Sequence, residues 1–225
     1  MSQEDDAFAE PRREMIEAIK ASVRDSASYT GRDRLSDRVI EAMATVPRHA
    51  FVPPEQRHVA YRNTPLPIDA GQTISQPLIV ALMTDLLEPQ PDDIILEVGT
   101  GSGYQAAVLS ELVKQVYSIE IIESLAGQAR KVLAERGYAN VTVRAGDGYA
   151  GWPEHAPFDG IVVTAAPEEI PPPLLQQLKP GGKLVIPVGE EHGYQELLVL
   201  EIDGDGAVSH RSVLPVRFVP LTGDR

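Results

Sequence analysis

A short apolar run that leads directly into a glycine-rich loop constrains this chain more than any other feature. Residues 94–98 are Ile-Ile-Leu-Glu-Val, and Gly99-Thr100-Gly101-Ser102-Gly103 follow before a helical pattern begins. Glycine permits positive φ and close approach of a ligand to the main chain, and free N–H groups at a helix start favour polar or anionic ligand atoms. The sequence therefore predicts a strand, a tight turn and a helix that form a site for a nucleotide-like cofactor.

Three acidic residues lie where the strands of such a fold would end. Glu120 follows Gly101 by 19 residues, the distance at which a carboxylate accepts the ribose hydroxyl groups of a nucleotide. Asp147, followed by Gly148, is expected to meet an adenine edge, and Glu97 is expected to take a cationic group such as an α-ammonium. Each acid alone could equally be a solvated loop residue or a helix cap. Three acids at successive strand ends favour a ligand site.

Strands and helices alternate regularly after the glycine loop and then give way to strands alone. Strands are predicted at 94–98, 114–119, 141–144, 160–164 and 183–188, helices at 103–112, 124–136 and 172–178, and a turn at 179–182. Two further strands, 195–202 and 207–214, flank a turn and form a hairpin. This order predicts a doubly wound α/β fold with a mostly parallel sheet and an antiparallel C-terminal hairpin.

The first 90 residues have a different character. Residues 1–9 are expected to be disordered, helices are predicted at about 10–28 and 36–46, and 26–31 is expected to form a loop. Six prolines then occur between residues 47 and 77, a long connection of the kind that is often functional. A helix is predicted from about 76 to 87.

Composition excludes several classes of function. The formal net charge of −13 argues against general attraction to nucleic acid or anionic lipid. Absence of cysteine excludes disulfides, thiolate metal sites and cysteine nucleophiles. No metal site is predicted, because His58, His155, His192 and His210 lack the spacing of metal ligands. The acidic N-terminus lacks the features of a signal peptide, and no apolar stretch approaches the roughly 18 residues of a membrane span. A cytoplasmic location is expected.

The glycine loop and its downstream acids resemble S-adenosyl-L-methionine-dependent methyltransferases of the Rossmann-like class. Further motifs are similar to those of the protein-L-isoaspartate O-methyltransferase family. They are Val-Pro-Arg-His-Ala-Phe-Val-Pro at 46–53, Gly-Gln-Thr-Ile-Ser-Gln-Pro at 71–77, Gly-Asp-Gly-Tyr-Ala-Gly-Trp at 146–152, the run from Phe158 to Pro167, and Val-Arg-Phe-Val-Pro-Leu at 216–221. The similarity covers about 36–222, whereas the first 35 residues look like an extension with no clear counterpart in short bacterial members.

The resemblance implies an activity and a set of site residues. A methyl group would pass from S-adenosyl-L-methionine to the α-carboxylate of an L-isoaspartyl residue in a damaged protein or peptide, which initiates repair through a succinimide. The catalytic serine of the family falls on Ser75, and the acceptor contacts fall on Thr73, Ile74 and Ser75. The cofactor contacts implied are Glu97, Gly99, Thr100, Gly101, Ser102, Gly103, Tyr104, Glu120, Ile121, Asp147, Gly148 and Thr222.

The chemistry of carboxyl methylation agrees with these residues. A carboxylate is already ionised near pH 7, and the sulfonium becomes neutral as the methyl group leaves. No strong general base is needed, and positioning alone can supply roughly 7–11 kcal/mol. Ser75 is therefore expected to orient the acceptor carboxylate through a hydrogen bond. The alternative is that Ser75 is only the N-cap of the helix at 76–87.

Three rival functions remain open at this point. One is a related methyltransferase that acts on a specific aspartate of a peptide. Another is a nicotinamide-dependent oxidoreductase, although Tyr104 occupies the third glycine position of the G-x-G-x-x-G pattern. The third is a binding module that has lost catalysis. The expected partners are isoaspartyl proteins and peptides, with no nucleic acid, membrane or metal, and the chain is expected to be a monomer.

The resemblance also suggests a division of the chain. Residues 1–35 would form a partly helical N-terminal extension, and 36–225 a single methyltransferase domain. Within that domain, 36–90 would form a helical cap and substrate segment, and 91–225 the cofactor-binding core.

Overall fold

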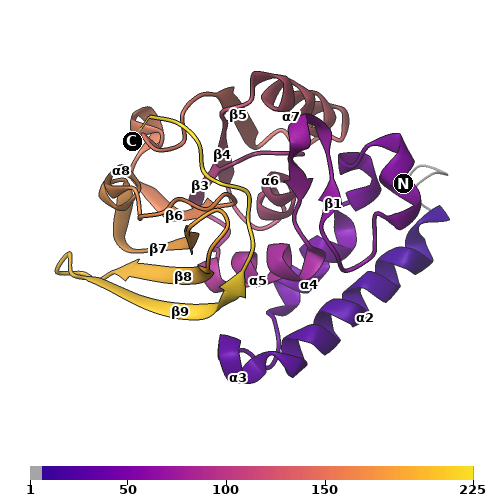
Figure 1. Cartoon of the computed structure of the whole chain (residues 1–225), viewed down its shortest axis with the longest axis horizontal. Helices are drawn as coiled ribbons and strands as arrows, with labels where there is room; N and C mark the ends of the chain where they lie inside the picture. The colour runs from indigo at the N-terminus through magenta and orange to yellow at the C-terminus, as the bar shows by residue number, and fades with distance from the viewer. Residues whose placement is uncertain (1–6, 225) are drawn as a thin grey trace.

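A mixed sheet forms the centre of the computed structural model, which describes residues 7–224. Its strands lie in the order β5-β4-β3-β6-β7-β8-β9, and Figure 1 shows them from β5 at the top of the view to β9 at the bottom. The bounds are β3 (Ile94–Val98), β4 (Gln115–Glu120), β5 (Val141–Ala145), β6 (Phe158–Val163), β7 (Leu178–Gly189), β8 (Gln195–Ile202) and β9 (Val208–Val216). Strands β3 to β7 pair in parallel, and β8 pairs antiparallel with β7 and β9. The predicted fold class is confirmed.

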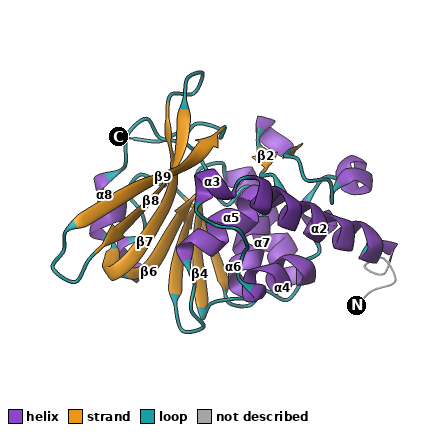
Figure 2. Cartoon of the chain, turned by 90° about the horizontal axis from the view of Figure 1, so that it is seen from below, coloured by secondary structure: helices purple, strands orange, loops and turns teal. Residues whose placement is uncertain are grey.

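Side chains of the central strands are buried on both faces of the sheet. In β3, Ile95 belongs to the hydrophobic cluster on the helical face, whereas Leu96 and Val98 belong to the cluster on the opposite face. A continuous apolar run is typical of a parallel strand that is covered on both sides. Figure 2 shows most of the helices gathered on one side of the sheet.

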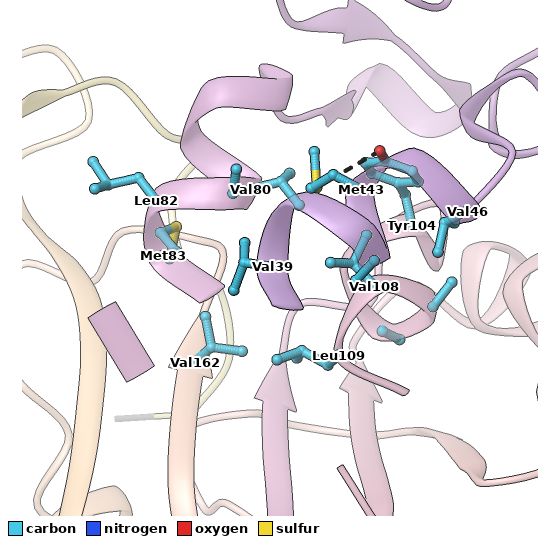
Figure 3. Close-up of a cluster of buried hydrophobic side chains, with 14 of the residues drawn as sticks. Val39, Met43, Val46, Val80, Leu82, Met83, Tyr104, Val108, Leu109 and Val162 are labelled. Atoms are coloured by element: carbon cyan, nitrogen blue, oxygen red, sulfur yellow. Dashed lines mark hydrogen bonds between the residues drawn. The ribbon is translucent and has the colours of Figure 1, made fainter. Parts of the chain in front are cut away.

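Helices α4 (Asp37–Thr45), α5 (Pro77–Leu87), α6 (Tyr104–Ser110) and α7 (Glu123–Glu135) contribute to the first cluster. The opposite face is covered by α8 (Pro172–Gln176) and the chain around the 3-10 turn η4 (Pro153–His155). Figure 3 shows side chains of α4, α5 and α6 meeting, with the Tyr104 hydroxyl 3.9 Å from the sulfur of Met43. Tyr104 thus joins the start of α6 to the core.

The N-terminal helix α2 (Ala9–Asp25) lies along the outside of this helical layer, as the indigo ribbon of Figure 1 shows. It contacts α4 and α5 through a buried stripe of Met15, Ile16, Ile19 and Val23. The predicted helix at 10–28 is confirmed over most of its length, but the expected loop at 26–31 is wrong. A short helix, α3 (Ala27–Thr30), occupies it because the Thr30 hydroxyl donates to the carbonyl of Ser26 and Gly31 ends the helix at φ 68°. Of the segment expected to be disordered, residues 1–6 lie outside the described part of the chain.

The proline-rich segment at 47–77 folds as a series of short elements. They are η1 (Arg48–Phe51), η2 (Pro54–Val59), β1 (Leu66–Pro67), η3 (Asp69–Gly71) and β2 (Thr73–Ile74). Strands β1 and β2 pair antiparallel. His49 is fully buried within this segment, where its Nδ1 lies 2.8 Å from the Tyr61 hydroxyl and its ring stacks on Phe8 at 4.1 Å. The segment is therefore anchored to the N-terminal helix.

The turn expected at 179–182 lies inside a strand. β7 begins at Leu178, which pairs with Phe158, and the next pair joins Gly160 to Lys183. The intervening residues form an irregularity in one continuous strand, because the pairing resumes on either side of it. Within the described part of the chain, no helix is long and apolar enough to cross a membrane.

Candidate active site

One pocket brings the upstream segment and the glycine loop together at the carboxyl ends of β3, β4 and β6, where open α/β sheets bind ligands. Twelve of the predicted site residues line it: Thr73, Ile74, Ser75, Gly99, Thr100, Gly101, Ser102, Tyr104, Glu120, Ile121, Gly148 and Thr222. Glu97, Gly103 and Asp147 do not line its wall.

The glycine loop turns sharply between β3 and α6. Gly99, Gly101 and Gly103 have φ values of 97°, 52° and 87°, which side chains other than glycine adopt only with strain. The amides of Gly99 and Thr100 both donate to the carbonyl of Ile119 at 2.8 and 3.2 Å. These bonds fix the loop against the end of β4. Gly103 lies behind the wall, where an added Cβ would come within 3.3–3.4 Å of Leu133 and Ala129.

The carboxylate of Glu120 is held at the end of β4 by two backbone amides. Gly101 N–H donates to Oε2 at 2.8 Å, and Ile122 N–H donates to Oε1 at 2.9 Å. The side chain is nearly buried but lines the pocket. Each carboxylate oxygen can accept a further hydrogen bond, so the geometry suits hydroxyl groups of a sugar.

Glu97 lies below the glycine loop and not at its surface. It is fully buried, Ser118 donates a hydrogen bond to its Oε2, and the Ser118 hydroxyl is also 2.5 Å from the Thr100 hydroxyl. Burial raises the pKa of Glu97 to about 8, the nearby Glu120 charge also raises it, and the Ser118 hydrogen bond opposes both. Glu97 is therefore mostly a neutral acid at pH 7, and the expected direct contact with a cationic ligand group does not follow from its position.

The Asp147 carboxylate accepts hydrogen bonds from two backbone amides near the pocket. Its Oδ1 accepts from Tyr149 N–H at 2.9 Å, and its Oδ2 accepts from Asp224 N–H at 2.7 Å. Its neighbour Gly148 lines the pocket, and a Cβ at that position would lie 2.4 Å from Cγ1 of Val98. Asp147 thus ties the C-terminal segment to the loop after β5.

Ser75 stands free at the junction of β2 and α5. The N-cap of α5 is Gln76, and Pro77 begins the helix. Among the residues that the structure describes, none forms a hydrogen bond with the Ser75 hydroxyl, whereas its carbonyl accepts from Arg48 at 2.8 Å. The alternative that Ser75 merely caps the helix is therefore wrong, because Gln76 is the N-cap, and Ser75 is one of the residues that line the pocket.

Arg48 lies directly behind this end of the pocket. The side chain is fully buried, its Nε donates to the Ala60 carbonyl at 2.9 Å, and its guanidinium lies 4.8 Å from the ring centre of Tyr104. Burial lowers the pKa of Arg48 to about 10, and the nearby Tyr104 and Tyr61 partly offset that effect. Arg48 remains a cation at neutral pH.

Several wall residues were not predicted as site residues, although some of them lie in the sequence motifs at 71–77, 158–167 and 216–221. They are Gln72, Val80, Val98, Gln105, Ile119, Ile122, Thr164, Ala165, Val219, Pro220 and Leu221. Thr164 and Ala165 follow β6 at the carboxyl edge of the sheet, a position that could have marked them. Val219 to Leu221 belong to the motif at 216–221, and a parallel bridge between Ala166 and Pro220 holds this segment beside the pocket.

The wall has the composition that a nucleoside-type cofactor requires. Ile119, Ile122 and Leu221 offer apolar surface for a base, Glu120 offers acceptors for ribose hydroxyls, and Gly148 leaves room that a side chain would fill. Within residues 7–224, no cluster of three or more potential ligands for a metal ion is present.

Trp152 belongs to the core, where it packs on Tyr117 and beneath the Arg144 guanidinium.

Comparisons with known proteins agree with this geometry. Residues 28–225 match the family profile of protein-L-isoaspartate(D-aspartate) O-methyltransferases. The chain is 58% identical to protein-L-isoaspartate O-methyltransferase 2 of Syntrophobacter fumaroxidans, over 97% of this chain and 89% of that protein. It is 59% identical to the protein of the same description from a Polaromonas species, over 94% of this chain and all of that protein. The first of these matches extends into residues 1–35, because it spans 219 residues.

Two solved structures share the fold over most of the chain. One protein-L-isoaspartate O-methyltransferase superposes with a TM-score of 0.81 at 27% identity, over 94% of this chain and 66% of that chain. A Plasmodium falciparum structure assigned to the same enzymes was determined with S-adenosyl-L-homocysteine. It superposes with a TM-score of 0.72 at 25% identity, over 89% of this chain and 97% of that chain.

Proposed function

The chain belongs to the protein-L-isoaspartate(D-aspartate) O-methyltransferase family, and from this premise we propose which residues hold the acceptor and which hold the cofactor. The family activity is methylation of L-isoaspartyl residues in protein repair, with S-adenosyl-L-methionine as the methyl donor. Gly99 to Ser102, Glu120, Ile121 and Gly148 form the cofactor end of the site. Thr73, Ile74 and Ser75 form the acceptor end.

The observation that carries this assignment is the single pocket that both groups of residues line. Methyl transfer requires the acceptor oxygen and the methyl carbon to lie in line and in contact. A pocket lined by both the glycine loop and β2 would bring the two reactants together. Thr222, on the C-terminal segment, also lines the pocket and would complete its wall.

The residues near Ser75 suit a carboxylate acceptor. S-adenosyl-L-methionine supplies an electrophilic methyl group when bound. The Ser75 hydroxyl, which has no described internal partner, would donate a hydrogen bond to one oxygen of the acceptor carboxylate and leave the other aimed at the methyl carbon. No proton has to be removed from an ionised carboxylate, so the site needs no general base.

The methyl ester would then close to a succinimide when the following backbone nitrogen displaces methanol. Hydrolysis of the succinimide returns part of the material to normal aspartate. This second stage requires no further residue of the enzyme.

Two broader features of the protein are also part of the proposal. We infer a monomer, because the large exposed apolar residues Tyr29, Ile121, Tyr194 and Val208 come from different elements. We also propose the cytoplasmic location that is expected from the sequence. Light scattering after gel filtration tests the first, and cell fractionation tests the second.

A direct test of the site assignment uses backbone amide chemical shifts. S-adenosyl-L-homocysteine should shift Gly99 to Ser102 and Ile121, and an isoaspartyl peptide added next should shift Thr73 to Ser75. The matching normal aspartyl peptide is the control and should cause no comparable shifts. Methylation of the normal peptide alone, or isoaspartyl shifts confined to another face, would contradict the proposal.

A further inference from the structure

Among the residues that the structure describes, Arg48 is a buried cation without a buried anion to match it. Its side chain has no exposed surface, and its nitrogens bond to carbonyl oxygens of Ala60 and Ser75. Its Nη1 has no hydrogen-bond partner among the described residues. No carboxylate of the described chain forms an ion pair with it. Carbonyl oxygens and the Tyr104 ring stabilise the charge only partly.

The Arg48 cation lies next to the wall of the pocket. Arg48 touches two residues of the pocket wall, Ser75 through its carbonyl and Tyr104 through its ring. Helix α5 begins beside Ser75 with no acidic residue in its first turn, so its N-terminal dipole adds to the same positive potential. Glu120 is the one carboxylate among the described residues of the wall, and it belongs to the end assigned to the cofactor.

A positive charge at this position would help an anionic acceptor to bind to a protein whose net charge is −13. An anionic acceptor gains nothing from the overall field of such a protein. A cation one layer behind the wall, in a low-dielectric interior, attracts a carboxylate strongly over a short range. The acceptor would in turn provide the missing negative charge for Arg48.

We propose that Arg48 is a positioning residue that selects the ionised acceptor carboxylate and holds it against Ser75. This inference rests on the proposed acceptor site at Thr73–Ser75. Arg48 acts from behind the wall, through the Ser75 carbonyl and through its charge, and takes no part in bond making.

The test compares two peptides that differ only in charge at the acceptor. One carries the isoaspartyl α-carboxylate, and the other carries the uncharged α-carboxamide in its place. Each is measured as a ligand of the complex with S-adenosyl-L-homocysteine. The unmodified enzyme should prefer the carboxylate by about ten-fold or more in dissociation constant, which corresponds to about 1.4 kcal/mol.

Substitutions of Arg48 should change this preference in a charge-dependent way. Arg48→Gln keeps donors for the carbonyls but removes the charge, and the preference should fall to about two-fold or less. Arg48→Lys should restore most of it. Arg130→Met removes an exposed arginine of α7 and should leave the preference unchanged. Affinity for S-adenosyl-L-homocysteine should stay within about two-fold in all variants.

The experiment distinguishes failure of the Arg48 inference from failure of the proposed function. Equal weakening of both peptides in Arg48→Gln, or a preference that survives it, would overturn the inference and leave the proposed function intact. Failure of the unmodified enzyme to methylate the isoaspartyl peptide would instead overturn the proposed function. If Arg48→Gln does not fold, the unmodified complex still decides: the pKa of a ¹³C-labelled acceptor carboxyl should fall on binding, and a constant or raised pKa would overturn the inference.

Discussion

Glu97 and Ser118 are direct register partners on the parallel strands β3 and β4, and the Ser118 hydroxyl donates a hydrogen bond to the Glu97 carboxyl group. Both side chains are completely buried. The same hydroxyl lies 2.5 Å from that of Thr100, so the pair supports the glycine loop from below. A neutral carboxyl group at this place avoids the cost of a buried charge.

The titration of Glu97 should make the protein less stable as the pH rises. Its pKa is raised from 4.5 to about 8 in the folded state, so between these values the folded chain binds a proton that the unfolded chain has lost. The free energy of unfolding should therefore fall with rising pH, by on the order of 1 kcal/mol per pH unit from this group. Glu97→Gln should flatten this slope, as measured by urea unfolding at pH 5, 6, 7 and 8.

An exposed glutamate provides the control for this experiment. Glu41→Gln on α4 removes the same ionisable group from the surface and should leave the slope unchanged. An identical pH slope in the unmodified protein and in Glu97→Gln would show that Glu97 is ionised in the fold.

The position of Glu97 also shows where sequence reasoning was incomplete. Its place at the end of a strand suggested the surface of the ligand site. Residues two apart in a strand share a face, so Glu97 lies on the same face as Ile95, which packs under the helical layer. Counting this alternation could have identified a buried acid.

Elements with strong periodic signals were predicted closely. β3 at 94–98 and β8 at 195–202 have the expected bounds, since each is a continuous run of strand-forming residues between turn signals. Helix α3 was missed because the serines and Thr30 of this segment favour turns, and a local hydrogen bond of Thr30 and a contact of α3 with the edge strand β9 go unseen in the sequence. The acceptor end of the site was found only through the family resemblance, because no local pattern brings β2 to the glycine loop.

Gly148→Ala should damage the cofactor pocket. The new Cβ would lie 2.4 Å from Cγ1 of Val98 and 3.7 Å from Cδ1 of Leu221, and Val98 is fixed in the central strand. The loop after β5 must shift, at a cost of about 1–3 kcal/mol. We expect a lower melting temperature and at least about ten-fold weaker binding of S-adenosyl-L-homocysteine by calorimetry.

Gly127→Ala on α7 is the matched control, because a Cβ there meets nothing within 4 Å. It should leave binding unchanged and stabilise the helix by about 0.5–1 kcal/mol. Unchanged affinity in Gly148→Ala would mean that the cofactor does not depend on this wall of the pocket.

Glu120→Gln should weaken cofactor binding. Both carboxylate oxygens accept backbone amides, from Gly101 and Ile122. A glutamine must turn an NH₂ group toward one of these donors and loses an acceptor for a ribose hydroxyl. Loss of charge-assisted bonds of about 1.5–3 kcal/mol predicts a dissociation constant for S-adenosyl-L-homocysteine that rises about 10- to 100-fold.

Glu123 is an exposed residue at the start of α7 and provides the control. Glu123→Gln should change the dissociation constant for S-adenosyl-L-homocysteine by less than about two-fold. If Glu120→Gln raises the KM of the isoaspartyl peptide and leaves cofactor binding unchanged, Glu120 belongs to the acceptor end and the assignment is reversed.

Ser75→Ala should lower turnover much more than cofactor affinity. Ser75 lines the pocket and its hydroxyl has no described internal partner, so in the proposed acceptor site its loss would remove only a contact with the acceptor. One hydrogen bond to a charged group contributes about 1.5–3 kcal/mol, which predicts a fall in kcat/KM for the isoaspartyl peptide of about 10- to 100-fold. Because Gln76 is the N-cap of α5, the melting temperature should stay close to that of the unmodified protein, without the loss of about 1 kcal/mol expected for a cap. Thr64→Ala changes an exposed position of the same proline-rich segment. It should leave kcat/KM for the isoaspartyl peptide and the affinity for the cofactor unchanged. A parallel loss of cofactor affinity in Ser75→Ala would assign the serine to the cofactor, and a fall in stability alone would assign it a structural role.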